Sequence, residues 1–184
     1  MRRHNAILAV LSCTLLCGTL LSCRSPVRSD ERDDLGPELP DVEPGEFHRP
    51  GQPCLRCHDS NGGQDPEMVV AGTIFATPDE KIPVANATVI VVDALEEFRN
   101  VTTNCVGNFY ITREDWENPA FPLQTSLTCP DGGGGVMDSL IHRDGACAGC
   151  HEGRPDVDSP GWLFCYPSGE SPVSADPSCP GRVP

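Results

Sequence analysis

The sequence predicts a mainly β protein in which a small sheet region has loop-rich segments on either side. Between residues 67 and 130, short runs of β-branched and aromatic residues are bounded by Pro, Gly, Asn and Asp, as is typical of strands joined by turns. Helical periodicity is absent from this region. The chain has 19 Pro and 18 Gly among 184 residues and only 5% aromatic residues, which predicts long loops and a modest core.

Residues 1–22 have the features of an export signal. Arg2 and Arg3 precede an apolar run at residues 6–21, which is shorter than the roughly 20 residues that span a bilayer. The run leads into Leu-Leu-Ser-Cys, which resembles a bacterial lipobox and implies that Cys23 is lipidated. An ordinary signal peptide that contains cysteines is the alternative. The lipobox predicts an exported lipoprotein of the cell envelope, at the outer membrane or periplasmic face, anchored by its lipid.

Residues 23–46 predict an extended acidic tether. The stretch is rich in Asp, Glu and Pro, and such a composition buries too little apolar surface to order itself. The whole chain has a formal net charge of −14, and loss of residues 1–22 removes two arginines and no acidic residue. Nucleic acid is therefore excluded as a partner, because binding a phosphate backbone requires a basic patch.

Two C-x-x-C-H motifs flank the strand region, in segments 47–66 and 131–184. Their residues are Cys54, Cys57, His58, Cys147, Cys150 and His151. This pattern is the attachment signal for c-type haem, because two thiols at this spacing reach one porphyrin edge and the following histidine reaches the iron. A C-x-x-C pair alone also serves zinc and dithiol redox sites. The histidine after each pair favours haem, so we predict two covalently bound haem c groups.

The second axial ligand of each iron has four candidates: His48, Met68, Met137 and His142. His48 and His142 each begin an H-R-x-G pattern shortly before a motif. If this is a true repeat, each histidine caps the opposite haem, because a ligand so near its own motif must turn around the porphyrin edge. Met68 precedes the first strand and is expected in the core. We predict Met137 at the second iron, and His142 or His48 at the first.

Four further cysteines predict two disulfides, since disulfides persist outside the cytoplasm. They are Cys105, Cys129, Cys165 and Cys179, which allow three pairings. We expect Cys105–Cys129 and Cys165–Cys179, because each pair closes a short local loop.

The strand region resembles the Ig-like β-sandwich of carboxypeptidase regulatory-like and collagen-binding B-type repeats. The resemblance is carried by Ala-Gly-Thr-Ile-Phe at residues 71–75, Ala-Thr-Val at 87–89 and Gly-Asn-Phe-Tyr-Ile at 107–111. It implies a small Ig-like β-sandwich over residues 67–130. The strand-forming runs themselves lie at residues 69–75, 87–92, 100–103, 108–112 and 123–127.

The lipobox, the two motifs and the sandwich together resemble bacterial outer-surface c-type cytochromes. The resemblance implies electron transfer with redox partner proteins such as other cytochromes, and a methionine shortly before the second motif, here Met137. The alternatives are a haem enzyme or sensor, such as a peroxidase-like protein with one open iron site, and an adhesion or scaffold role. No catalytic constellation stands out, since the histidines outside the signal are all motif residues or candidate iron ligands.

Overall fold

A computed structural model describes residues 26–38, 42–167, 174 and 176–180. The predicted signal peptide at residues 1–22 and the lipidation site Cys23 lie outside the described residues. The chain divides into two compact units, residues 1–34 and 35–184. None of the described helices is long and apolar enough to cross a membrane.

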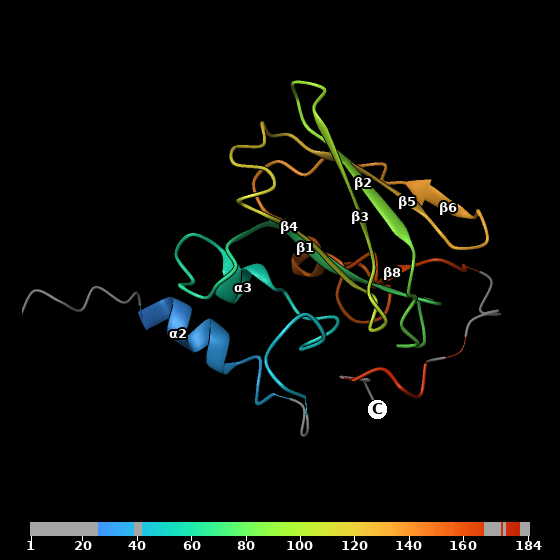
Figure 1. The fold of residues 1–184 in the computed structure, drawn as a ribbon, viewed down its shortest axis with the longest axis horizontal. Coiled ribbons are helices and arrows are strands. Elements are labelled where there is room, and N and C mark those ends of the chain that lie inside the picture. The colour runs from blue at the N-terminus through green and yellow to red at the C-terminus, as the bar shows by residue number, and fades with distance from the viewer. Residues whose placement is uncertain (1–25, 39–41, 168–173, 175, 181–184) are drawn as a thin grey trace, which may run out of the picture. The chain divides into compact units, whose positions relative to one another are not determined.

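The described part of the first unit contains helix α2 (Pro26–Asp33), drawn in blue in Figure 1. The prediction of an extended tether is wrong for these residues. Proline is favoured in the first turn of a helix, where its missing N–H has no intrahelical partner in any case. Arg32 lies in the last turn, where a positive charge complements the helix dipole.

Arg49 binds another part of the acidic stretch, residues 35–38, which begin the second unit. Its Nε lies 2.7 Å from the Glu38 carboxylate, and its two terminal nitrogens donate to the carbonyl oxygens of Leu35 and Gly36 at 3.4 and 2.8 Å. Charge composition predicted a solvated tether, whereas a single arginine binds both a side chain and the backbone of this segment.

Strand β1 (Met68–Phe75) is the centre of the first sheet, and all eight of its residues are buried. One edge pairs antiparallel with β4 (Asn108–Thr112), and β7 (Gly145–Ala146) pairs parallel at Val70 and Ala71 on the other. Strand β8 (Leu163–Phe164) pairs parallel further along, at Ile74 and Phe75. Strand β1 therefore joins the central region to two short segments near the C-terminus.

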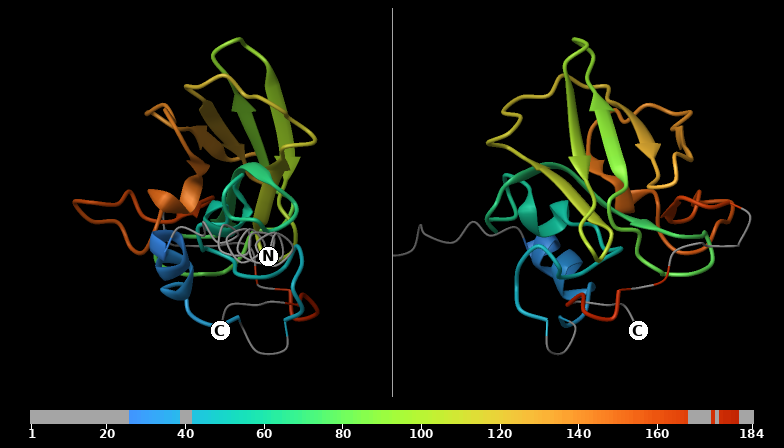
Figure 2. Two further views of the ribbon diagram at one scale, coloured as in Figure 1. Left: turned by 90° about the vertical axis from the view of Figure 1, so that its left-hand side faces the viewer. Right: turned by 45° about the vertical axis from the view of Figure 1, so that its right-hand side comes forward.

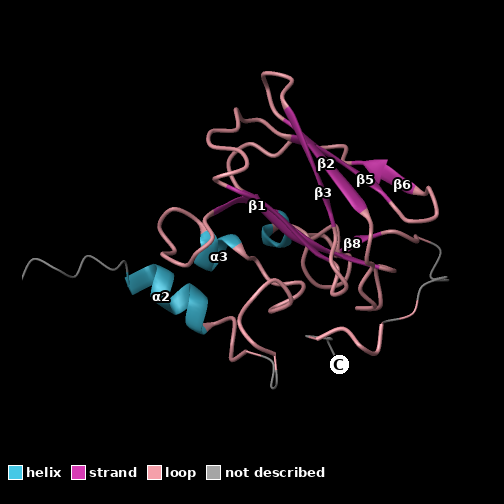
Figure 3. Ribbon diagram, viewed as in Figure 1, coloured by secondary structure: helices cyan, strands magenta, loops and turns pink. Residues whose placement is uncertain are grey.

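The second sheet has the order β3-β2-β5-β6, and all of its neighbours are antiparallel. Its strands are β2 (Thr88–Val92), β3 (Phe98–Thr102), β5 (Gln124–Thr128) and β6 (Gly134–Val136). The two sheets form two layers (Figures 1 and 2), and long loops join them (Figure 3). With 27% strand and 8% helix, the chain is mainly β, as predicted.

The core lies between the two sheets, where β-branched residues of β1 and β2 meet an aromatic residue of β4. Val70, Ile74, Val89, Val91 and Phe109 belong to one buried cluster. The five predicted strands are confirmed, with ends shifted by one or two residues at most. Strands β6, β7 and β8 were missed, because two or three residues in a Gly-rich or irregular context carry no period-2 pattern.

Both disulfides form, but the predicted pairing is wrong. The bonds are Cys105–Cys179 and Cys129–Cys165, which close loops of 74 and 36 residues. Cys129 follows β5 of one sheet and Cys165 follows β8 of the other, so the fold brings them to a Cα–Cα distance of 5.8 Å. A disulfide requires two cysteines whose Cα atoms lie within about 7 Å of each other. The prediction was wrong because it used nearness in the sequence in place of this distance in the fold.

Asp93 closes the β2–β3 hairpin with hydrogen bonds to three backbone amides. Its Oδ1 accepts from Leu95 and Glu97 at 2.9 and 3.0 Å, and its Oδ2 accepts from Ala120 at 3.0 Å. The Ala120 amide is the largest cause of a pKa below the ordinary value of 3.8 for this carboxyl. Asp93 therefore stabilises the fold above that pH, and the contribution is lost as the pH falls through its lower folded pKa.

We predict that Asp93→Asn lowers the free energy of unfolding at pH 6 and lowers it less at pH 3. Denaturant unfolding of the wild type and the variant at both pH values measures this difference. Glu114→Gln, which changes an exposed carboxyl next to a turn, is the matched control and should show little difference at either pH. A destabilisation by Asp93→Asn of the same size at both pH values contradicts the prediction.

Candidate functional site

The first C-x-x-C-H motif lies on a single helical turn that packs against β1. Helix α3 (Leu55–His58) begins directly after Cys54, and the His58 amide donates to the Cys54 carbonyl oxygen at 3.0 Å. Leu55 is buried with Met68 and Ala71 of β1, and Cys54 packs against this cluster. Met68 is therefore a core residue, as expected. The turn places the thiols and the imidazole of this motif next to the central strand.

The second motif reaches the same strand from the opposite end of the sequence. Strand β7 pairs with β1 and leads directly into the 3-10 helix η1 (Cys147–Gly149). The His151 amide donates to the Cys147 carbonyl oxygen at 2.8 Å, which repeats the bond between His58 and Cys54. The two motifs therefore share one local backbone arrangement on different supporting elements.

Both motif histidines have one ring nitrogen bound to a backbone carbonyl. Nδ1 of His58 lies 3.0 Å from the Pro66 oxygen, and Nδ1 of His151 lies 2.9 Å from the Gly161 oxygen. A carbonyl oxygen only accepts, so Nδ1 carries the proton and the lone pair of Nε2 is open to a metal. Burial also holds the pKa of His151 below its ordinary value, which favours the neutral imidazole that binds metals.

The second motif packs against β1 at Gly72, next to the residues that the first motif contacts. A Cβ atom at this position would lie 2.9 Å from the Cys147 Cβ and 2.8 Å from the Phe109 ring, so only glycine leaves room for Cys147. Cys54 and Ala146, the residue before Cys147, pack against the same buried cluster of Leu55, Met68 and Ala71. The first cysteines of the two motifs are therefore neighbours, although 93 positions separate their residue numbers.

The four motif thiols differ from the other cysteines of the second unit. Cys54, Cys57, Cys147 and Cys150 are free, while the remaining four form the two disulfides. Burial raises the pKa of Cys54 to about 11 and that of Cys147 to about 12. Dithiol redox enzymes need the opposite shift, because the thiolate is their nucleophile. The burial of these thiols therefore opposes the dithiol alternative.

A cavity of about 860 Å³ opens beside the second motif and is lined by Cys147, Cys150 and His151. Its volume lies in the upper part of the roughly 300–1,000 Å³ range of cofactor pockets. Apolar side chains from β5, β6 and β8 complete the lining, among them Leu127, Val136 and Leu163. The donors and the apolar walls suit a porphyrin attached along one edge.

Met137, the predicted ligand of the second iron, and His142, a candidate for the first, both line this cavity. Met137 follows β6 and is half-buried, and its Sδ accepts a hydrogen bond from the Thr125 hydroxyl at 3.7 Å. His142 is exposed at the cavity wall. Trp162 also lines the cavity, between Phe75 at 5.6 Å and the Lys81 ammonium at 5.0 Å.

His48 lies beside its own motif, with its ring centre 5.8 Å from that of His58. His142 likewise lines the cavity of its own motif. The expectation that each of these histidines caps the opposite haem therefore differs from the structure. The chain turns back within few residues, because the Gln52 amide donates to the Arg49 carbonyl oxygen at 3.2 Å and both Arg49 and Gly51 have positive φ.

Sequence reasoning missed the groups that hold the motifs. The carbonyls of Pro66 and Gly161 leave no signal in the sequence, because every residue has a carbonyl. Among the described residues, no group of three or more His, Cys, Asp and Glu side chains is placed to hold a metal ion. Haem iron needs no such group, because the chain supplies only its axial ligands.

No protein-family model, no curated protein and no solved structure matches this chain.

Proposed function

We propose that this protein is a dihaem c-type cytochrome that is anchored to a membrane by lipid on Cys23 and carries electrons outside the cytoplasm. The observation that carries the proposal is the meeting of both C-x-x-C-H motifs on β1. Cys147 packs where Gly72 has no side chain, and Cys54 packs against the same cluster as Ala146, the residue before Cys147. Two haems attached at these cysteines have neighbouring edges.

The residues of the two motifs have separate roles. Cys54 and Cys57 hold the first haem through thioether bonds, and His58 presents Nε2 to its iron. Cys147, Cys150 and His151 do the same for the second. When bound, each haem supplies a one-electron couple between ferric and ferrous iron. The carbonyls of Pro66 and Gly161 fix the imidazole tautomer and increase the electron donation of each ligand.

Neighbouring haems favour electron transfer, because tunnelling rates fall steeply with edge-to-edge distance. The formal net charge of −14 predicts that long-range attraction steers redox partners with a basic face, such as other cytochromes. We also propose that the β-sandwich is Ig-like, and that it is the scaffold that supports both motifs.

The large cavity at the second motif favours one alternative function. Met137 already bonds to Thr125, and His142 is exposed. If neither side chain binds the second iron, the space of about 860 Å³ admits peroxide or another small ligand, as in a haem enzyme or sensor. Carbon monoxide binding to the reduced protein separates the two functions, because a six-coordinate carrier binds it slowly or not at all.

We predict that the protein made in a cytochrome-maturing host carries two haems that survive denaturation. The double variant Cys147→Ser/Cys150→Ser and its counterpart Cys54→Ser/Cys57→Ser should each retain one, because the motifs have separate supports. Haem absorbance per polypeptide in denaturant measures the count. Release of all haem on denaturation, or zinc at both motifs instead, contradicts the proposal.

We predict that Cys23→Ser moves the protein from the membrane fraction to the soluble fraction without a change in its haem spectrum. The lipid supplies the membrane affinity, about 0.8 kcal/mol per buried methylene. Ser25→Thr, which lies outside the Leu-Leu-Ser-Cys sequence, is the matched control and should stay at the membrane. Membrane retention of Cys23→Ser means that another surface of the protein binds the membrane.

A further inference from the structure

The rings of His48 and His58 lie at the separation expected for two axial ligands of one iron. Their ring centres are 5.8 Å apart and their planes differ by 38°. Two imidazoles bound to opposite sides of one metal, with metal–nitrogen bonds of about 2 Å, have ring centres about 6 Å apart. The observed separation therefore fits two ligands of one iron. A simple aromatic pair has separations of about 4.5–7 Å and is the competing interpretation.

The other ring nitrogen of His48 lies against the backbone of Gly45, which leaves Nε2 open to a metal in one of its two tautomers. The Gly45 amide lies 3.1 Å from His48 Nδ1 and donates to it when the ring proton is on Nε2. The Gly45 carbonyl oxygen also contacts Nδ1 and accepts from it when the ring proton is on Nδ1. With the proton on Nδ1 and donated to that carbonyl, Nε2 is open to a metal. His58 and His151 have the same Nδ1-to-carbonyl contact. A backbone carbonyl at this nitrogen is characteristic of metal-binding histidines.

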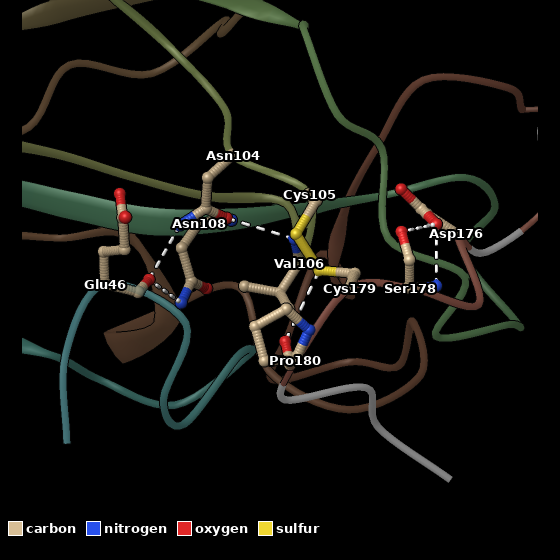
Figure 4. The surroundings of a disulfide bond; sticks show 9 residues. All are labelled: Glu46, Asn104, Cys105, Val106, Asn108, Asp176, Ser178, Cys179 and Pro180. Atoms are coloured by element: carbon tan, nitrogen blue, oxygen red, sulfur yellow. Dashed lines mark hydrogen bonds between the residues drawn. A yellow bond between two sulfur atoms is a disulfide. The ribbon is translucent and has the colours of Figure 1, made fainter. Parts of the chain in front are cut away.

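Two asparagines fix the loop that carries His48. Nδ2 of Asn104 donates to the Glu46 carbonyl oxygen at 2.7 Å (Figure 4). Nδ2 of Asn108 donates to the carbonyl oxygens of Glu46 and His48 at 3.2 and 3.1 Å. Three hydrogen bonds therefore hold the backbone on both sides of Phe47.

The asparagines are themselves held rigidly. Asn108 begins β4 and is buried, and its Oδ1 accepts from the Thr73 hydroxyl of β1 at 2.8 Å. Asn104 accepts the amides of Val106 and Asn108 at 3.1 Å through its Oδ1. Cys105 in the same turn is bonded to Cys179 (Figure 4). The turn at residues 104–108 is thus fixed to the sheet and to the C-terminal segment.

We infer that His48 is the second axial ligand of the first haem, and that Asn104 and Asn108 are the positioning residues that hold it against His58. The inference rests on the proposed function, because it requires haem at Cys54 and Cys57. It assigns the first haem a bis-histidine iron supported by the sheet. It also removes His142 from the first iron.

The test uses the full chain carrying Cys147→Ser/Cys150→Ser, in which every haem signal comes from the first motif. A parent that retains no covalent haem contradicts the proposed function, so this count is made first. With haem present, the ferric spectrum should be low-spin. His48→Ala should convert it to high-spin, the reduced form should bind carbon monoxide, and added imidazole should restore the low-spin spectrum. His142→Ala is the control and should change nothing.

Asn104→Asp tests the positioning role. Aspartate keeps the oxygen that accepts from Val106 and Asn108, and replaces the donor to Glu46 with a charged oxygen that repels the Glu46 carbonyl. The rate of carbon monoxide binding, limited by release of His48, should rise about fivefold, the factor expected for loss of one ordinary hydrogen bond. An unchanged rate overturns the positioning role. A high-spin parent, an unchanged His48→Ala spectrum, or conversion by His142→Ala overturns the ligand assignment.

Discussion

The pairing of β1 on both of its edges is the constraint on which the site depends. This strand is buried along its whole length, with β4 on one edge and β7 and β8 on the other. The first motif packs against it at Ala71, and the second follows β7, which pairs with it at Val70 and Ala71. Two segments far apart in the sequence therefore meet only because this strand is central to its sheet.

The two motifs share a backbone arrangement and differ in their surroundings. The first is supported by an α-helical turn, a buried histidine and a hydrogen-bonded loop that carries His48. The second follows a 3-10 turn and borders a large cavity whose other ligand candidates are a half-buried methionine and an exposed histidine. In the proposed cytochrome, the site of the first iron is therefore the more rigidly defined, and the coordination of the second iron would separate a carrier from an enzyme.

Local sequence patterns predicted the strands, but they did not predict contacts between residues that lie far apart in the sequence. Alternating β-branched residues placed five strands to within two residues, and the spacing of the motifs identified their cysteines and histidines. The disulfide pairing was wrong, because β8 brings Cys165 to Cys129 and no local pattern encodes that approach. The tether prediction failed at α2, since composition reports average polarity and misses a helix that begins at Pro26. The proximity of His48 to His58 depends on asparagines about 60 residues away.

Circular dichroism in the Soret region tests most directly whether two haems are neighbours at β1. Adjacent haems couple their transitions, so the dihaem protein should give a two-signed band that differs from the sum of the two one-haem variants. Gly72 leaves the space in which Cys147 packs, and Cys54 lies nearby, so the account predicts this coupled band. A spectrum equal to the sum of the two variants would contradict the account, because the haems would then be independent.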